Sequence, residues 1–386
     1  MFIGGIFDCM RGQTEGELGK QRTTSGALAK KLGVSRSTIS RALNGYPHVD
    51  EELRGRIIAL AAEMNYSPNQ AARSLANRET ALVGVVVYVK PEGTGEFCEY
   101  VEMVLKGIRF AARQFKDFGL QVEVVKTDIS NPHEQAEAIA GLVEKGVRGI
   151  VLAPSHPELI APEIDRLVER GIQVLLIDTD VPQSNRLCFV GSDYQRSGRI
   201  SAELVGLALK GRGKVAMIAY NEGGFMVPQK ISGFRQEMSA YPMVEILGPF
   251  KLSRIGQHLY EDTLEMIREY QPDAIYMTYG QLADVARAVV DSGKAGKIAI
   301  IGYDTSSQVL EYLRRKVITA VIDQDPAQQG ALSIQVLYDA LVLNNRPLSS
   351  VVNARLTIVT SQNCNYFRQG ALNVMTYNFM ERDSAK

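Results

Sequence analysis

Three short segments between residues 23 and 64 place apolar residues at every third or fourth position, which is the spacing of one helix face. Gly33 separates the first segment from the second, and Ser35 stands where an N-cap residue of the second is expected. The inner positions are Leu28, Ala29, Leu32, Ile39, Ala42, Leu43, Leu53, Ile57, Leu60, Ala61 and Met64. The pattern predicts three amphipathic helices around a small core, the first two joined by a glycine turn.

From residue 81 onward, the pattern changes to short apolar runs that alternate with longer amphipathic segments such as 100–115 and 197–209. The predicted strands cover 82–88, 120–126, 149–154, 172–179, 187–193, 214–220, 274–279, 297–304 and 318–325. Strands that are apolar on both faces and alternate with helices form parallel sheets covered by helices. Because about nine strands exceed a usual open sheet, we expect two doubly wound lobes.

Composition places the chain among water-soluble globular proteins of more than one compact unit. It has 386 residues, of which 45% are hydrophobic and 22% charged, and it lacks a run of 18 apolar residues that would span a membrane. The four cysteines are widely separated and form no CxxC pair. We therefore expect a reducing, cytoplasmic environment, with no zinc site and no disulfide framework.

The charge distribution is uneven although the formal net charge is zero. Residues 20–79 hold 10 Lys and Arg against five Asp and Glu, which leaves 33 against 38 for the rest of the chain. A basic N-terminal unit is what phosphate binding requires, whereas a merely solvated helical surface predicts more even mixing. The small unit is therefore a candidate for nucleic-acid binding.

The turn GVS followed by RSTISRALNG resembles the helix-turn-helix of the lactose-repressor (LacI/GalR) family of bacterial transcription factors. The stretch NYSPNQAARSLANRETALVGVVV, residues 65–87, is similar to the rest of that family's signature. The resemblance covers about residues 23–367. It implies a homodimer that binds double-stranded operator DNA through its headpiece, and a ligand domain like a type I periplasmic sugar-binding protein.

On this basis, we expect four parts in the chain. Residues 1–21 form a disordered extension or follow from a misassigned start codon, and residues 22–67 form an all-α DNA-binding headpiece. Residues 68–80 form a hinge helix and linker. Residues 81–386 form a two-lobed α/β domain for effector binding and dimerisation.

The second helix of the headpiece presents polar side chains to its outer face, of types that read base edges and contact phosphates. We expect Arg36 and Ser37 to read bases, and Arg41 and Asn44 to position the helix or to read. The other expected DNA contacts are Thr38, Ser40, Asn69 and Arg73.

The segment from Gln70 to Ala76 is too short to be a stable helix on its own, so a partner must induce it. The resemblance implies that this hinge folds on the operator and that Leu75 wedges into the minor groove, which favours deformable sequences. The alternative is that Leu75 is a linker residue packed on the next domain.

Ligands of open α/β sheets bind beyond the C-terminal ends of strands. The resemblance implies that Asp304 accepts hydrogen bonds from sugar hydroxyls and that Gln324 donates to the ligand. Three places depart from the family pattern: Lys230 replaces the usual arginine, Tyr279 begins the pair that is usually Asn-Asp, and His156 and Glu158 take the place of an acidic or polar pair. As alternatives, Asp304 caps the following helix and Lys230 pairs with a surface carboxylate.

These groups predict a small, hydroxyl-rich effector such as a sugar or polyol, because buried polar atoms need partners. We expect no cofactor and no metal, and no membrane partner. An enzyme is disfavoured because the chain has no GxGxxG after an early strand, no P-loop and no HExxH. A sugar-binding receptor of a transport system is the alternative function; it would need a signal peptide and no headpiece.

Overall fold

The structure is a computed structural model, and it describes residues 24–43, 49–64, 80–89, 96–220, 224–252 and 258–367. The predicted extension over 1–21, most of the predicted hinge, and the expected DNA contacts Asn44, Asn69, Arg73 and Leu75 lie outside these residues. By its internal contacts the chain divides into two compact units, Met1–Asn77 and Arg78–Lys386. They are called the headpiece and the ligand unit below.

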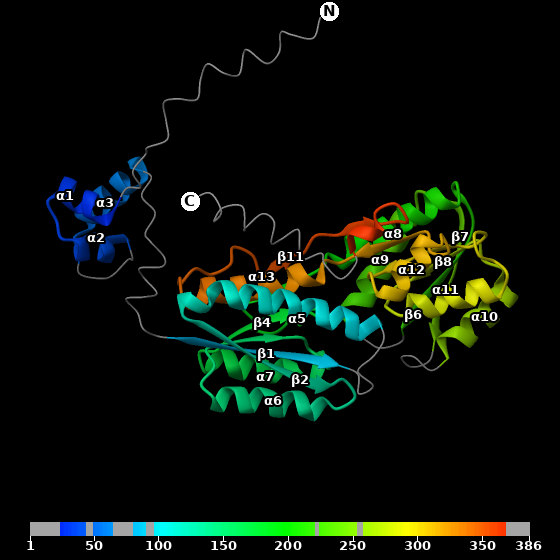
Figure 1. Cartoon of the computed structure of the whole chain (residues 1–386), viewed down its shortest axis with the longest axis horizontal. Helices are drawn as coiled ribbons and strands as arrows, with labels where there is room; N and C mark the ends of the chain where they lie inside the picture. The colour runs from blue at the N-terminus through cyan, green and yellow to red at the C-terminus, as the bar shows by residue number, and fades with distance from the viewer. Residues whose placement is uncertain are drawn as a thin grey trace, which may run out of the picture. The chain divides into compact units, whose positions relative to one another are not determined.

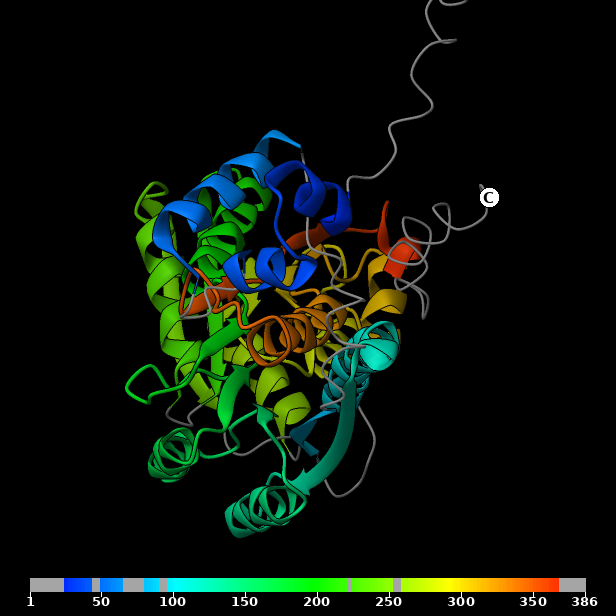
Figure 2. The same cartoon turned by 90° about the vertical axis from the view of Figure 1, so that its left-hand side faces the viewer.

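The headpiece contains the three predicted helices, which pack against one another and are drawn in blue in Figure 2. They are α1 (Ser25–Leu32), α2 (Arg36–Leu43) and α3 (Glu51–Glu63). Their buried core consists of Leu28, Ala29, Ile39, Ala42, Ile57 and Ala61. The apolar positions read from the sequence therefore face one another, with the remaining ones packed at the margin.

Local signals in the sequence fix where these helices begin and end. Gly33 ends α1 with φ +68°, a left-handed conformation that favours glycine. The Ser35 hydroxyl accepts a hydrogen bond from the Thr38 backbone N–H at 3.0 Å, so Ser35 caps α2 as predicted. Asp50 caps α3 by accepting from the Leu53 N–H at 3.0 Å. The turn between α1 and α2 is thus held at both ends.

The ligand unit consists of two lobes, each built on a six-stranded sheet (Figure 1). Lobe 1 has the strand order β11-β5-β4-β3-β1-β2 and lobe 2 the order β12-β10-β9-β8-β6-β7. The strands of lobe 1 are β1 (Ala81–Val89), β2 (Leu120–Asp128), β3 (Gly149–Leu152), β4 (Gln173–Ile177), β5 (Cys188–Gly191) and β11 (Val351–Asn353). Those of lobe 2 are β6 (Arg212–Tyr220), β7 (Met243–Leu252), β8 (Ala274–Met277), β9 (Ala299–Tyr303), β10 (Ala320–Asp323) and β12 (Thr357–Val359).

All nine predicted strands are present, and neighbouring strands are parallel except β10 and β12. The predicted pair of doubly wound sheets is confirmed. The sequence pattern missed β7, β11 and β12. In β7 the pair Gly248-Pro249 interrupts the run, beside an irregularity in its pairing with β6, and a proline normally argues against a strand interior. The other two are only three residues long and partly exposed.

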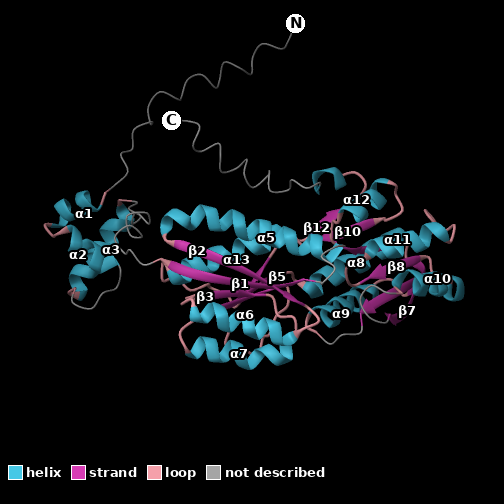
Figure 3. Cartoon of the chain, turned by 60° about the horizontal axis from the view of Figure 1, so that its bottom comes forward, coloured by secondary structure: helices cyan, strands magenta, loops and turns pink. Residues whose placement is uncertain are grey.

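Helices cover both faces of each sheet, as Figure 3 shows for the magenta strands between cyan helices. In lobe 1, α5 (Glu96–Phe115) and α13 (Pro326–Leu341) cover one face, and α6 (Pro132–Glu144) and α7 (Pro157–Glu169) the other. Strand β1 serves both layers because its side chains alternate: Val85 packs toward α5, and Val86 packs toward α6. This two-sided burial explains why the strand is apolar throughout.

Lobe 2 repeats this layering. Here α8 (Tyr194–Ala208) and α9 (Met226–Met238) cover one face, and α10 (Leu259–Tyr270), α11 (Leu282–Asp291) and α12 (Ser307–Arg314) cover the other. Two short 3-10 helices, η1 (Lys116–Phe118) and η2 (Cys364–Phe367), complete the described elements. None of the described helices is long and apolar enough to cross a membrane.

The chain passes between the lobes three times. It leaves lobe 1 between β5 and α8, returns between β10 and α13, and leaves again between β11 and β12. Helix α13 therefore belongs to lobe 1, although it follows the strands of lobe 2 in sequence. It packs closely on α5, and the absence of a side chain at Gly107 permits this approach. A Cβ at Gly107 would lie only 1.8 Å from the Ala327 carbonyl oxygen. In lobe 2, a Cβ at Gly198 of α8 would lie 2.1 Å from the Lys230 carbonyl oxygen of α9.

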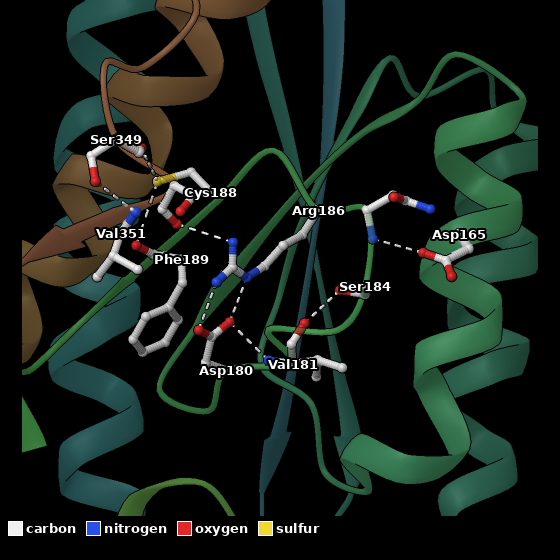
Figure 4. Close-up of polar contacts among 11 residues, drawn as sticks. Asp165, Asp180, Val181, Ser184, Arg186, Cys188, Phe189, Ser349 and Val351 are labelled. Atoms are coloured by element: carbon white, nitrogen blue, oxygen red, sulfur yellow. Dashed lines mark hydrogen bonds and ion pairs between the residues drawn. The ribbon is translucent and has the colours of Figure 1, made fainter.

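A buried ion pair holds the last strand of lobe 1 in place. Figure 4 shows the Arg186 guanidinium against the Asp180 carboxylate, with Arg186 Nε and Nη2 donating at 2.5 and 2.7 Å. A third donor, Nη1, contacts the Ser350 carbonyl just before β11 at 3.0 Å. Both charged side chains are almost fully buried, at 6% and 3% exposure, so each depends on the other for compensation.

Candidate functional site

The outer face of α2 carries the described members of the predicted DNA-reading set. Arg36, Ser37, Ser40 and Arg41 are exposed, and Thr38 is half-buried. The Ser35 hydroxyl lies 2.6 Å from that of Ser37 and 2.8 Å from that of Thr38, so the first turn of α2 presents a connected hydroxyl cluster. The Arg36 guanidinium lies over Gly26 of α1, where a Cβ would meet its Nη2 at 2.8 Å. The helix-turn-helix thus exposes two guanidiniums beside short hydroxyl side chains.

A pocket in the ligand unit lies where the strands of both lobes end. Its empty volume is about 520 Å³, and it is lined by Glu96, Phe97, Tyr100, Asp178, Met226, Lys230, Tyr279, Gly280, Gln281, Asp304 and Gln324. Four of the six predicted ligand residues are among these: Lys230, Tyr279, Asp304 and Gln324. Such a cleft, with aromatic walls and a few polar groups, suits a small polar ligand.

Asp178 and Asp304 occupy equivalent places in the two lobes. Asp178 follows β4 and Asp304 follows β9, which are the third strands in the two sheet orders. Both have left-handed backbones, with φ values of 63° and 69°. Burial raises the pKa of both carboxyl groups. Sequence reasoning found Asp304 and missed Asp178, although both stand directly after an apolar strand, in LLID and GYD.

Each of these aspartates has an ordered neutral donor. The Tyr88 hydroxyl donates to Asp178 Oδ2 at 2.6 Å, and the Gln324 amide donates to Asp304 Oδ1 at 2.8 Å. Gln324 and Asp304 therefore line the pocket side by side, and the hydrogen bond between them orients the Gln324 amide. The alternative that Asp304 caps α12 is wrong, because the Ser306 hydroxyl accepts from the Val309 N–H at 3.2 Å and fills that role.

Lys230 is a buried cation at 1% exposure, so the alternative that it pairs with a surface carboxylate is also wrong. Its Nζ donates to the Thr278 carbonyl at 3.3 Å and lies 3.5 Å from the centroid of the Tyr303 ring. Burial lowers the pKa of Lys230 to about 8, while Asp304 and Asp178 oppose that shift. The Tyr303 hydroxyl is fixed in turn by Tyr276 at 2.9 Å.

Two glutamates in the first turn of α5 reach from lobe 1 to lobe 2. Glu96 accepts from the backbone N–H groups of Leu282 and Ala283 at 3.2 and 2.8 Å, at the start of α11. Glu99 accepts from the Ser307 backbone N–H at 2.8 Å, at the start of α12. Carboxylates are favoured at helix N-termini, where unpaired N–H groups and the helix dipole converge. Burial raises the pKa of Glu96 to about 7.

Comparison with known proteins decides the family. Residues 28–69 match bacterial regulatory proteins of the lacI family, and residues 85–345 match the periplasmic binding protein domain. The ribose operon repressor of Bacillus subtilis is 33% identical over 346 residues, covering 81% of this chain and 95% of the repressor. The chain belongs to the lacI family of bacterial regulatory proteins. It is therefore a DNA-binding transcription regulator, and its curated relatives are regulators, not enzymes.

Two further comparisons support the architecture of this lacI-family regulator. Catabolite control protein A of Priestia megaterium is 23% identical over 321 residues, covering 80% of this chain and 90% of that protein. A glucose-galactose binding protein from Geobacillus stearothermophilus has a similar fold, with a TM-score of 0.65 and 23% identity over 74% of this chain and 99% of its own. The second comparison bears on the fold of the ligand unit.

Two predicted ligand residues of this lacI-family regulator do not line the pocket. His156 is half-buried at the start of α7, with Nδ1 3.1 Å from the Ser155 hydroxyl, and Glu158 is exposed in the first turn of that helix. Their expected role stays a prediction. Glu96 lines the pocket but was not predicted, because its position depends on a contact with residues 186 and 187 positions later in the chain.

Proposed function

We propose that this protein is a homodimeric repressor whose affinity for operator DNA is controlled by a sugar or polyol bound in the pocket of the ligand unit. The observation that carries the proposal is the combination, in one chain, of a helix-turn-helix and a two-lobed pocket with polar groups from both lobes. Its relatives support the proposal: one is a ribose operon repressor, and a structural neighbour is a glucose-galactose binding protein.

On the DNA side, we assign base reading to Arg36 and Ser37, and positioning or reading to Arg41 and Asn44. Thr38, Ser40, Asn69 and Arg73 contact the backbone or neighbouring groups, and Leu75 is the minor-groove wedge. Two headpieces of a dimer then bind two half-sites of an operator.

On the effector side, we assign Asp304, Gln324, Lys230 and Tyr279 to ligand contact, together with Asp178 from lobe 1. An effector changes operator affinity only if it binds the two states of the protein with different affinity. Residues contributed by both lobes supply this difference, because a ligand between them favours the closed arrangement. Lobe closure that moves the two hinges of a dimer would transmit effector binding to the DNA.

The test begins with selection of an operator from genomic fragments and measurement of its affinity by fluorescence anisotropy. Arg36→Ala or Ser37→Ala should relax base preference, costing about 1–3 kcal/mol per bidentate contact. The exposed Arg56→Ala on α3 removes the same charge and should weaken specific and non-specific binding alike. Leu75→Ala should weaken binding and DNA bending while sparing effector affinity.

Asp304→Ala should abolish the effector response and keep operator binding. A normal response in this variant would remove Asp304 from the site. Sedimentation should give a dimer of the 42.5 kDa chain. A protein that binds no genomic DNA would contradict the repressor assignment and favour a sugar receptor instead.

A further inference from the structure

Among the described residues that line the pocket, acidic and basic groups are unequal in number. The lining residues include three carboxyl groups, those of Glu96, Asp178 and Asp304, and one ammonium group, that of Lys230. A buried charge is costly unless an opposite charge or strong hydrogen bonds compensate it. The way in which each carboxyl group is compensated therefore bears on what the pocket binds.

Glu96 is partly compensated within the protein, since backbone hydrogen bonds oppose the effect of burial, which still raises its pKa to about 7. Both its carboxylate oxygens accept backbone N–H groups at the start of α11, at 2.8 and 3.2 Å, where the helix dipole favours a negative charge. Asp178 and Asp304 differ from it, since the hydrogen bonds to their carboxylates come from the neutral side chains of Tyr88 and Gln324. Neutral donors solvate a carboxylate but leave its charge in place.

Lys230 does not pair closely with either aspartate. Its Nζ is directed to the Thr278 carbonyl and to the Tyr303 ring, at 3.3 and 3.5 Å, and in the described parts of the chain it makes no ion pair within 4.0 Å. One ammonium group is thus shared by two aspartates, one from each lobe. Closing the pocket around an uncharged ligand would leave one of the two carboxyl groups either ionised without a counter-charge or neutralised by a proton, since burial raises both pKa values.

We propose that the effector carries a protonated amino group as well as hydroxyl groups, as an amino sugar or amino polyol does, and that the ammonium lies between Asp178 and Asp304. This inference rests on the proposed function and specifies its effector. The Phe97 and Tyr279 rings of the lining suit the apolar face of a sugar ring. The Gln324 amide, oriented by Asp304, serves the hydroxyl groups.

The equivalence of the two aspartates gives the ammonium a role in lobe closure. Because Asp178 and Asp304 belong to different lobes, their like charges repel when the lobes approach each other. A cation between them turns that repulsion into attraction from both sides. A neutral sugar of the same shape lacks this effect, so charge becomes a criterion of selectivity in addition to stereochemistry.

Isothermal titration of the full-length protein with matched pairs tests the proposal. The probes are glucosamine, galactosamine and mannosamine, each against its neutral parent sugar and its N-acetyl derivative, which keeps the nitrogen but not the charge. We expect at least one amine to bind at least ten-fold more tightly than both of its uncharged partners. A neutral sugar that binds as tightly as its amine, or a panel in which no amine binds, overturns the proposal.

Charge-removing variants assign the effect to the two aspartates. In Asp178→Asn and Asp304→Asn the preference for the amine over the neutral sugar should fall by ten-fold or more, even if both affinities change. Asp117→Asn, an exposed carboxylate on η1, removes the same charge outside the pocket and should leave the preference intact. A preserved preference in both pocket variants would overturn the assignment.

The outcomes separate this inference from the function on which it rests. A neutral sugar that binds tightly and changes operator affinity would keep the repressor function and overturn the charged effector. An amine that binds as expected without changing operator affinity would keep the ligand class and contradict its regulatory role.

Discussion

The two lobes of the ligand unit share a strand order and a helix layering, yet they contribute different chemistry to the pocket. Each places an aspartate with a left-handed backbone after the corresponding strand, Asp178 in lobe 1 and Asp304 in lobe 2. Lobe 1 adds Glu96 of α5, which accepts from the N-terminus of α11 in lobe 2. Lobe 2 adds the cation, Lys230. Topology fixes which positions of the chain reach the pocket, and the chemistry at those positions is set separately in each lobe.

Two ion pairs near the last strands, β11 and β12, differ in burial. Lobe 1 secures β11 through the buried Arg186–Asp180 pair. Near β12, Arg355 pairs with Asp325 at 3.2 Å, and the Arg355 side chain is 72% exposed. Since burial decides what a broken ion pair costs, the two arginines should differ strongly in their effect on stability.

The largest expected effect follows from removing the buried partner. Arg186→Ala leaves the Asp180 carboxylate buried without a counter-charge and should lower the free energy of unfolding by about 3–5 kcal/mol. Arg355→Ala, its exposed counterpart, should cost no more than about 1 kcal/mol. Urea unfolding of both variants measures this difference. Equal losses would mean that burial does not set the cost of breaking these two ion pairs.

The pH dependence of stability tests the carboxyl groups near the cleft. Burial raises the pKa of both Glu96 and Asp323 to about 7 in the folded protein. The unfolded chain releases these protons at its ordinary, lower pKa, so the folded state binds more protons in between. The stability contributed by these two groups should therefore be fully present below about pH 4 and be lost as the pH rises through 7, by about 3 kcal/mol for Glu96 and about 4 kcal/mol for Asp323.

Glu96→Gln should remove its share of that slope and leave the share of Asp323. The comparison is made on the slope of unfolding free energy against pH between 5 and 7, since the amide also changes the absolute stability. An unchanged slope would mean that Glu96 is ionised at its ordinary pKa.

Helix packing is the next test, because the two lobes use glycine in the same way. Gly107→Ala and Gly198→Ala place a Cβ 1.8 and 2.1 Å from a carbonyl oxygen of the neighbouring helix, and each should destabilise by about 1–3 kcal/mol. Gly198→Ala displaces the backbone of Lys230, so it should also weaken effector binding, whereas Gly107→Ala should do so less. Unfolding and titration on the same samples check both expectations.

Gly141→Ala in α6 is the matched control. A Cβ there has no neighbour within 4 Å, so the substitution should stabilise by up to about 1 kcal/mol through helix propensity. Destabilisation at Gly141 would show that a glycine-to-alanine change in these helices is harmful without a close contact. Close packing would then not explain the losses at Gly107 and Gly198.

The smallest expected effect concerns the exposed contact between the lobes. Glu99→Gln weakens the contact with the start of α12 and should raise the effector Kd by roughly two- to five-fold, in line with about 0.3–1 kcal/mol for a charge at a helix N-terminus. Glu123→Gln breaks an ion pair with Lys145 within lobe 1 and serves as the control. A larger effect of the control would argue against a role for Glu99 in closure.

Much of the architecture followed from the sequence, for a physical reason. Strands buried on both faces must be apolar throughout, which made the central strands recognisable, and the partly exposed edge strand β2 was recognised as well. Strand β7 escaped because its Gly248-Pro249 pair breaks the pattern, although the bulged pairing tolerates it. In the pocket, Asp304 and Lys230 were found through a resemblance to a family. Glu96 was missed because no local pattern records a contact made across 186 residues.

The return of α13 to lobe 1 has a consequence for synthesis on the ribosome. The α5 side of lobe 1 is covered by residues such as Ile334 and Leu337, which are added more than 200 residues after Leu105. At about 5–20 residues per second, this surface waits roughly 10 to 50 s for its partner. The strands of lobe 2 are made during that interval, with an apolar face of lobe 1 still open to water. Lobe 1, which is first in sequence, is thus completed late. Until then its nascent form exposes an apolar surface that can bind a chaperone or aggregate.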